Sequence, residues 1–275
     1  AFAAVAVQAQ SLTKPGVDAG NINARGSVVG GITQIGGGAL SVANGGRFSV
    51  TVADTLPGGQ NARVGGVAGV VKAASITTNG SVGGTILQTR IGSLEGGNEQ
   101  LVSVGSVSNT TANNINVAGS TTAIVSQIGG SVATGANVQA LQVGGVDDVK
   151  ANNITARGSL AGVSTQITAE GLGVFNEQIA SIGGARGVDA GNLNLKGTFI
   201  GALTQTNLSL GREFSSQVIN VGGVHNTRAR NITTNGSVTG GVTQINAAVA
   251  AASNLQSAVV GGVEGATVEG NDPAK

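Results

Sequence analysis

The 275-residue chain contains no cysteine, methionine, tryptophan or tyrosine, and only 2% of its residues are aromatic. The absence of cysteine excludes disulfide bonds and thiolate metal sites. Because large side chains are scarce, alanine, valine and isoleucine must fill any core, so we expect that core to be thin. Charged residues make up 10% of the chain, and 14 basic against 13 acidic residues give a net charge of +1. This balance gives no electrostatic case for binding nucleic acid or an anionic membrane.

Long apolar runs are also missing. No run approaches the roughly 20 residues that a membrane-spanning helix needs, so we expect no transmembrane segment. Disorder is disfavoured because 40% of the residues are hydrophobic and β-branched residues are plentiful. Residues 1–9 resemble the end of a signal peptide, with Val7-Gln8-Ala9 as a cleavage site; the alternative is that they are a mature β-strand. Both interpretations predict a secreted protein.

Glycine is abundant instead, with 48 residues, and the sequence repeats itself every 39 residues over most of its length. Internal repeats of this kind indicate a stacked architecture. Two glutamine series carry the repeat: Gln34, Gln88, Gln127, Gln166, Gln205 and Gln244, and then Gln60, Gln100, Gln139, Gln178, Gln217 and Gln256. A glycine series accompanies them: Gly26, Gly80, Gly119, Gly158, Gly197 and Gly236. The first repeat carries an insertion at about 36–59, which we interpret as an extra strand pair or flap, or else as a decorative surface loop.

The repeats predict one domain over residues 1–275 without linkers. Six tandem repeats are expected at 17–66, 67–106, 107–145, 146–184, 185–223 and 224–262, flanked by partial repeats at 1–16 and 263–275. Within a repeat the apolar residues alternate with a period of two, which is typical of strands. In the fourth repeat one face carries Ile154, Ala156, Gly158, Leu160, Gly162, Ser164 and Gln166. The glutamine therefore shares the apolar face.

A buried glutamine is costly unless its amide is hydrogen-bonded. If each repeat forms one rung, equivalent amides lie about 4.8 Å apart and can bond to one another as a ladder. We therefore predict an all-β fold, a parallel β-solenoid with one repeat per rung and inward glutamine ladders. Gly-Gly pairs such as Gly144-Gly145 end the strands, and the glycines permit tight corners. The alternatives are two coils of about 20 residues per repeat, or glutamines that face solvent and recur only through gene duplication.

Charges give a test of the rung length, because directly stacked neighbours should differ in sign. Two series with the 39-residue spacing do so wherever their members are formally charged: Asp147, Arg186, His225 and Glu264, and then Lys150, Asp189 and Arg228. Arg157 and Lys196 have the same spacing and the same sign, which counts against direct stacking.

The two ends of the chain resemble incomplete repeats. The segment Val7–Leu12 resembles Val138–Val143, and Val263–Thr267 continues the phase of Val224–Arg228. We expect partial rungs of adjacent subunits to meet there, so that the ladder runs through the junction and deletion of residues 1–12 abolishes polymerisation. The junction residues would be Val5, Val7, Gln8, Leu12, Val263, Glu264 and Val268. No polar capping repeat of the kind that soluble solenoids carry is evident.

Glycine-rich strands with recurring inward glutamines resemble the curlin and Fap-type bacterial functional amyloids. The local likeness is best at Ile32–Ala39 and at Gln127–Gly130. This resemblance implies an extracellular biofilm fibre in which each repeat makes one layer of a β-solenoid, with a nucleator or an outer-membrane secretion factor as a further partner. The segment Asn153–Leu160 resembles filamentous-haemagglutinin-type β-helices, which are the main alternative.

Groups for catalysis are scarce. His225 is the only histidine and falls at a charged outer position, which favours a surface role over a catalytic one. Asp147 and Asp148 are adjacent strand residues and should point to opposite faces, so they do not form an acid pair. We expect no enzyme activity, cofactor or metal. The predicted function is that of a self-assembling fibre subunit whose partners are copies of itself, on the cell surface or outside the cell. The alternative is a monomeric β-helical adhesin or passenger domain that binds a surface ligand.

Overall fold

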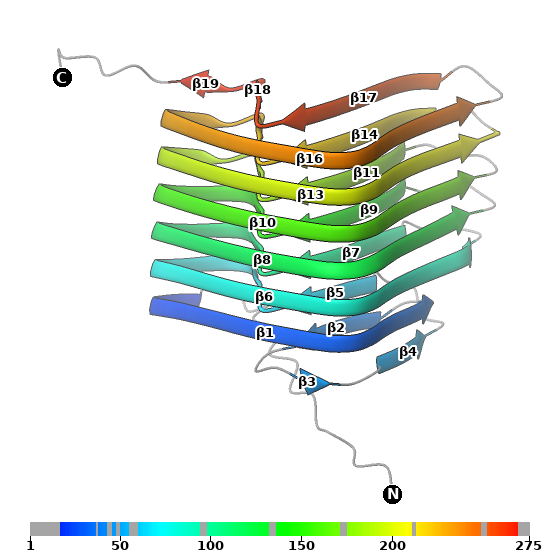
Figure 1. Cartoon of the computed structure of the whole chain (residues 1–275), viewed down its shortest axis with the longest axis horizontal. Helices are drawn as coiled ribbons and strands as arrows, with labels where there is room; N and C mark the ends of the chain where they lie inside the picture. Colours follow the sequence, from blue (N-terminus) through cyan, green and yellow to red (C-terminus); the bar gives the residue numbers. More distant parts are fainter. Residues whose placement is uncertain are drawn as a thin grey trace, which may run out of the picture.

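A computed structural model describes residues 17–36, 38–42, 46–47, 50–54, 60–93, 98–131, 136–170, 175–210, 213–248 and 252–268. These residues form a parallel β-solenoid without helices (Figure 1). Six long strands stack in the order β1 (Val17–Gly36), β6 (Val67–Ser93), β8 (Val107–Ser131), β10 (Val146–Glu170), β13 (Asp189–Ser209) and β16 (Arg228–Ala248). The predicted all-β solenoid is therefore confirmed.

A second sheet of short strands faces the long ones. Its order is β2 (Gly38–Val42), β5 (Gln60–Val64), β7 (Asn98–Val104), β9 (Ala136–Val143), β11 (Phe175–Ile182), β14 (Glu213–Val221) and β17 (Ala252–Val260). Each long strand from β6 onwards is followed in the chain by the short strand of its own rung. Corner strands pair in the later rungs: β12 (Ala185–Arg186), β15 (Val224–His225) and β18 (Val263–Glu264). The last element, β19 (Thr267–Val268), pairs with the start of β16.

Strand register shows that one repeat makes one rung. Gln166 pairs with both Gln127 and Gln205 in the long sheet, and Gln178 pairs with Gln217 in the short sheet. The alternative with two coils per repeat is therefore wrong. Arg157 and Lys196 are indeed neighbours in this register, and both side chains are exposed, so water can solvate the two like charges.

The core is thin and consists of small and medium apolar side chains. One cluster lies between the second half of the long strands and the short strands, and includes Val125, Leu141 and Phe199. A second cluster lies near the corners and includes Val107, Ile154 and Leu195. Phe175 and Phe214 stack outside these clusters, with ring centroids 5.7 Å apart. The prediction that aliphatic residues dominate the interior holds for these clusters.

The insertion of the first repeat forms an additional partial layer. Its strands β3 (Gly46–Arg47) and β4 (Val50–Asp54) pair in parallel with β1, and β2 pairs in parallel with β5. In Figure 1 β3 and β4 lie beneath β1 and β2 lies beneath β5, at the end of the stack opposite to β17–β19. The insertion therefore contains strands, but they pair with β1 and β5 and not with one another as an extra strand pair would.

Candidate assembly site: the glutamine ladders and the ends of the stack

Both predicted glutamine series form continuous ladders inside the solenoid. In the first, the Nε2 atoms of Gln88, Gln127, Gln166, Gln205 and Gln244 donate to the Oε1 of the preceding member at 2.6, 2.9, 2.8, 2.8 and 2.9 Å. In the second, Gln100, Gln139, Gln178, Gln217 and Gln256 do the same at 2.9, 2.8, 3.0, 2.9 and 2.8 Å. Every bond points the same way along the stack, from the later residue to the earlier one. Aligned amides polarise one another, which strengthens each bond.

The same amides also join the two sheets. The first series donates across to the short strands, at the carbonyls of Leu101, Ala140, Ile179, Val218 and Ser257. The second series donates to the long strand of the next rung, at the carbonyls of Thr89, Ile128, Ile167, Thr206 and Ile245. The cross-sheet bonds explain why glutamine is needed and a hydroxyl would not suffice: an amide supplies two donors and an acceptor.

The ladders are buried in the middle of the stack and exposed at its last rung. Gln166 and Gln178 are almost fully buried, whereas Gln244 is half-buried and Gln256 is exposed. Gln256 keeps its ladder bond to Gln217 at 2.8 Å. Within the described part of the chain, no long strand follows whose carbonyl could take the cross-sheet bond of Gln256. The last rung is therefore left with incomplete hydrogen bonding.

The predicted strand glycines lie where the long strands pass against the corner backbone that follows the short strands. A Cβ on Gly158 would come within 2.1 Å of the Val143 oxygen and 2.2 Å of the Gly183 nitrogen. The same holds at Gly80, Gly119, Gly197 and Gly236, and a Cβ on the corner residue Gly65 would come within 2.6 Å of the Gly26 nitrogen. The corners themselves use a glycine with φ near +60°: Gly65, Gly105, Gly144, Gly183, Gly222 and Gly261. Each of them opens a Gly-Gly pair except Gly105, which is followed by Ser106. Left-handed φ of this kind favours glycine.

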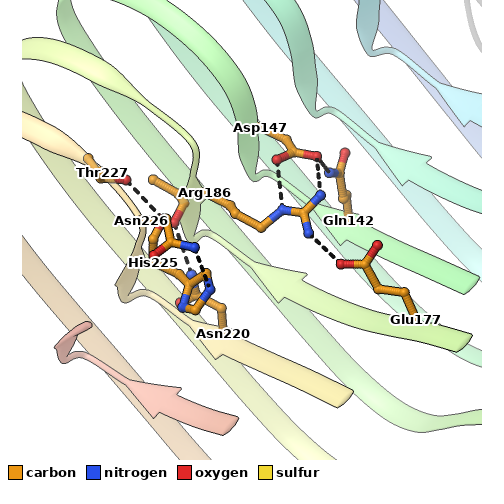
Figure 2. A network of polar contacts seen from close by, with 9 residues as sticks. Gln142, Asp147, Glu177, Arg186, Asn220, His225, Asn226 and Thr227 are labelled. Atoms are coloured by element: carbon orange, nitrogen blue, oxygen red, sulfur yellow. Dashed lines mark hydrogen bonds and ion pairs between the residues drawn. The ribbon is translucent and has the colours of Figure 1, made fainter. Parts of the chain in front are cut away.

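A column of charged residues runs along the corner, as the 39-residue spacing predicted (Figure 2). Arg186 pairs with Asp147 at 3.0 Å and with Glu177 at 2.8 Å. Burial disfavours the charge on Arg186, but its bonds and its attraction to the two carboxylates outweigh burial and raise its pKa. Lys150 and Asp189 form the second predicted pair, at 3.3 Å and more exposed.

The top of this column is part of the predicted subunit junction. His225 Nδ1 lies 3.2 Å from the Glu264 carboxylate, and Ser257 donates to that carboxylate at 2.6 Å. The hydrogen bond from the Ser257 hydroxyl is the main reason that the pKa of Glu264 lies below its ordinary value. Burial opposes this lowering, and the contact with His225 adds to it. Val263 is exposed and Val268 pairs with Ala229. The other predicted junction residues, Val5, Val7, Gln8 and Leu12, lie outside the described residues.

Two hydrogen-bonded series of asparagines were not predicted from the sequence. The exposed column of Asn114, Asn153, Asn192 and Asn231 is joined by bonds of 2.9, 2.8 and 2.7 Å. Inside, Asn137 donates to Asn176, and Asn176 donates to Asn207 at 3.0 Å. The 39-residue spacing of the exposed column could have revealed it. Asn207 could not be found that way, because it comes from a long strand and the other two from short strands.

Groups that could support chemistry are sparse over the described residues. No three of its histidine, aspartate and glutamate side chains lie close enough together to hold a metal ion. No helix in the part of the chain that the structure covers is long and apolar enough to cross a membrane. Asp148 has a positive φ and a raised pKa, caused by burial first and by Asp147 second, with Arg186 opposing.

Comparison with known proteins finds no matching family, no matching curated relative and no matching solved structure.

Proposed function

We propose that this chain is a self-assembling structural subunit of an extracellular bacterial fibre, a biofilm matrix component or surface filament built by end-to-end stacking of solenoids. Its principal partner is then another copy of itself. The resemblance to curlin and Fap-type repeats supports the same proposal, and would add a nucleator or an outer-membrane secretion factor. The scarcity of catalytic side chains supports a mechanical role without enzyme activity.

The observation that carries the proposal is the exposed edge of the last rung that the structure describes. Val242 on β16 is 38% exposed, whereas Leu203, its neighbour one rung earlier, is 1% exposed. Val260 on β17 is 45% exposed, and its neighbour Val221 is fully buried. Inward apolar side chains that are covered in every inner rung thus face solvent here. A sheet edge with exposed apolar residues and free backbone groups is a template for further strands.

The test is electron microscopy of the purified protein, combined with fibre diffraction. Unbranched fibres with a meridional spacing near about 4.8 Å along the fibre axis support the proposal. Discrete short rods at every concentration tried would contradict it and would favour a monomeric adhesin or passenger domain.

A shallow outer groove is the observation that favours the adhesin alternative. It runs along the corner and is lined by Thr111, Asn113, Lys150, Asn152, Asp189 and Arg230. Amides, a hydroxyl and charges of both signs could bind a polar surface ligand. Binding of such a ligand by particles that never assemble would replace the fibre proposal.

A further inference from the structure

At each end of the stack, the residues that the structure describes form an incomplete layer. At one end, β18 and β19 begin a seventh layer: Val263 pairs with Val224, and Thr267 and Val268 pair with Arg228 and Ala229. At the other end, β3 and β4 run beneath the second half of β1, and β2 runs beneath β5. One layer therefore covers a corner and the start of a long strand, and the other covers the end of a long strand and a short strand (Figure 1).

The strand register allows the two layers to be compared position by position. Gly46 of β3 pairs with Val28 of β1, whose equivalent on the last long strand is Val238. Ala53 of β4 pairs with Ile35 of β1, whose equivalent on the last long strand is Ile245. β3 thus corresponds to positions 238–239 of β16 and β4 to the positions from 242 onwards, while β19 occupies positions 228–229.

The short sheet gives the same result. Gly38 and Val42 of β2 pair with Gln60 and Val64, whose equivalents on β17 are Gln256 and Val260. No described residue of β18 or β19 pairs with β17. The two incomplete layers occupy different positions of one rung, and neither obstructs the other.

We propose that these two incomplete layers combine at each subunit junction into one composite rung. β2, β3 and β4 of one copy add to the free edges of β17 and β16 of the next copy, beside that copy's own β18 and β19. This inference rests on the proposed self-assembly and specifies its interface. It differs from a junction built from residues 5–12, because the place that the repeat phase gives to that segment, next to β5, is occupied by β2.

The composite rung supplies what the last rung lacks. The register sets Val50 over Val242 and Val42 over Val260, the two inward positions that are exposed at the free end. In the rung before, the backbone carbonyl of Ile245 accepts a bond from Gln217. In the composite rung, Ala53 takes the equivalent position one layer further on, so its carbonyl can accept a bond from Gln256. Backbone pairing and apolar burial therefore both favour this partner.

The glutamine ladders do not pass through such a junction. Val52 takes the position over Gln244, and Gly38 takes the position over Gln256. Each subunit then contributes its six complete rungs plus one composite rung, and the axial repeat becomes about 34 Å at about 4.8 Å per layer. If the sixth rung of one copy met the first rung of the next directly, the axial repeat would be about 29 Å.

Engineered disulfides test the interface, because the chain has no cysteine of its own. The positions of Ser257 and Ala39 become neighbours in the composite rung, within reach of a disulfide, although they lie at opposite ends of one molecule. Thr243 and Thr51 give a second pair, on the long sheet. The matched control joins Ser257→Cys to Ala9→Cys, which would be neighbours if residues 5–12 formed the junction.

Assembled Ser257→Cys/Ala39→Cys protein should give a ladder of covalent multimers on a non-reducing gel after mild oxidation, and the control pair should stay at least tenfold less cross-linked. The Thr243→Cys/Thr51→Cys protein should behave like the first pair. A protein that lacks residues 1–12 should still form fibres, and their axial repeat should remain about 34 Å. Fibres that cross-link through the Ser257/Ala9 control pair would overturn the composite rung while leaving self-assembly intact. Fibres that cross-link through neither the Ser257/Ala39 pair nor the Thr243/Thr51 pair would do the same. A wild-type protein that never assembles would instead overturn the proposed function, and the inference with it.

Discussion

Gln166 Nε2 donates to the Oε1 of Gln127 at 2.8 Å and to the backbone carbonyl of Ile179 at 3.0 Å. The first bond joins consecutive rungs, and the second joins the two sheets of one rung. A single buried amide therefore resists separation of the solenoid in two directions. This double role explains why a residue that is costly to bury recurs at the same place in each repeat.

Replacing Gln166 by leucine should destabilise the unassembled protein strongly. The change leaves the Oε1 of Gln127 and the Ile179 carbonyl without this donor, and removes the acceptor of Gln205. Buried groups without partners cost about 1–3 kcal/mol each, so we expect a loss of about 3 kcal/mol in the free energy of unfolding. Urea unfolding followed by circular dichroism measures it.

The matched control is Gln256→Leu at the exposed end of the second ladder. This residue makes one ladder bond, to Gln217, and water can replace the bond there. Its substitution should cost less than about 1 kcal/mol. Equal losses for the two variants would mean that burial of the amides does not determine their contribution.

Glycine at position 158 is required by space. An added Cβ would lie 2.1 Å from the Val143 oxygen and 2.2 Å from the Gly183 nitrogen, both backbone atoms that cannot turn away. Gly158→Ala should therefore cost about 3 kcal/mol or more, or prevent folding. Gly241→Ala is the control, because nothing lies within 4 Å of its Cβ and the φ there is not left-handed. Thermal unfolding of both variants is the measurement, and a Gly158→Ala protein as stable as the control would refute the close approach.

The regular part of the architecture could be predicted from sequence because one physical requirement repeats. A buried amide needs a partner, and Gln127, Gln166 and Gln205 at equal spacing supply one another. The insertion could not be predicted in this way. Its strands join Val28 to Gly46 and Gly38 to Gln60, spacings unlike the rest, and no glutamine marks them. Whether it formed strands or a loop depended on free edges of β1 and β5 that only the folded structure reveals.

The carboxyl group of Glu264 should titrate below its ordinary range. Its lowered pKa means that the folded end of the stack gains stability from the charged form above the unfolded pKa, and loses that stability as the pH falls through the folded value, in the acid range below 4.5. Carboxyl-detected NMR titration of the unassembled protein measures the pKa. Ser257→Ala should raise it more than His225→Gln does, because the hydrogen bond from the hydroxyl is the largest single cause of the lowering. The reverse order would show that the histidine dominates this contact.

End-to-end assembly should depend on the apolar side chains of the last rung. Val242→Lys places a charge on β16 at an inward position that a further layer would cover, so burial of that charge would oppose stacking. The monomer should lose little stability, because this position is already 38% exposed. We expect fibre growth, followed by light scattering and microscopy, to slow at least tenfold. Val163→Lys is the matched control, since Val163 is 40% exposed but lies on the outer face of β10 in the middle of the stack. If both variants slow growth alike, fibres form through their sides, and the free end of the solenoid is not where subunits join.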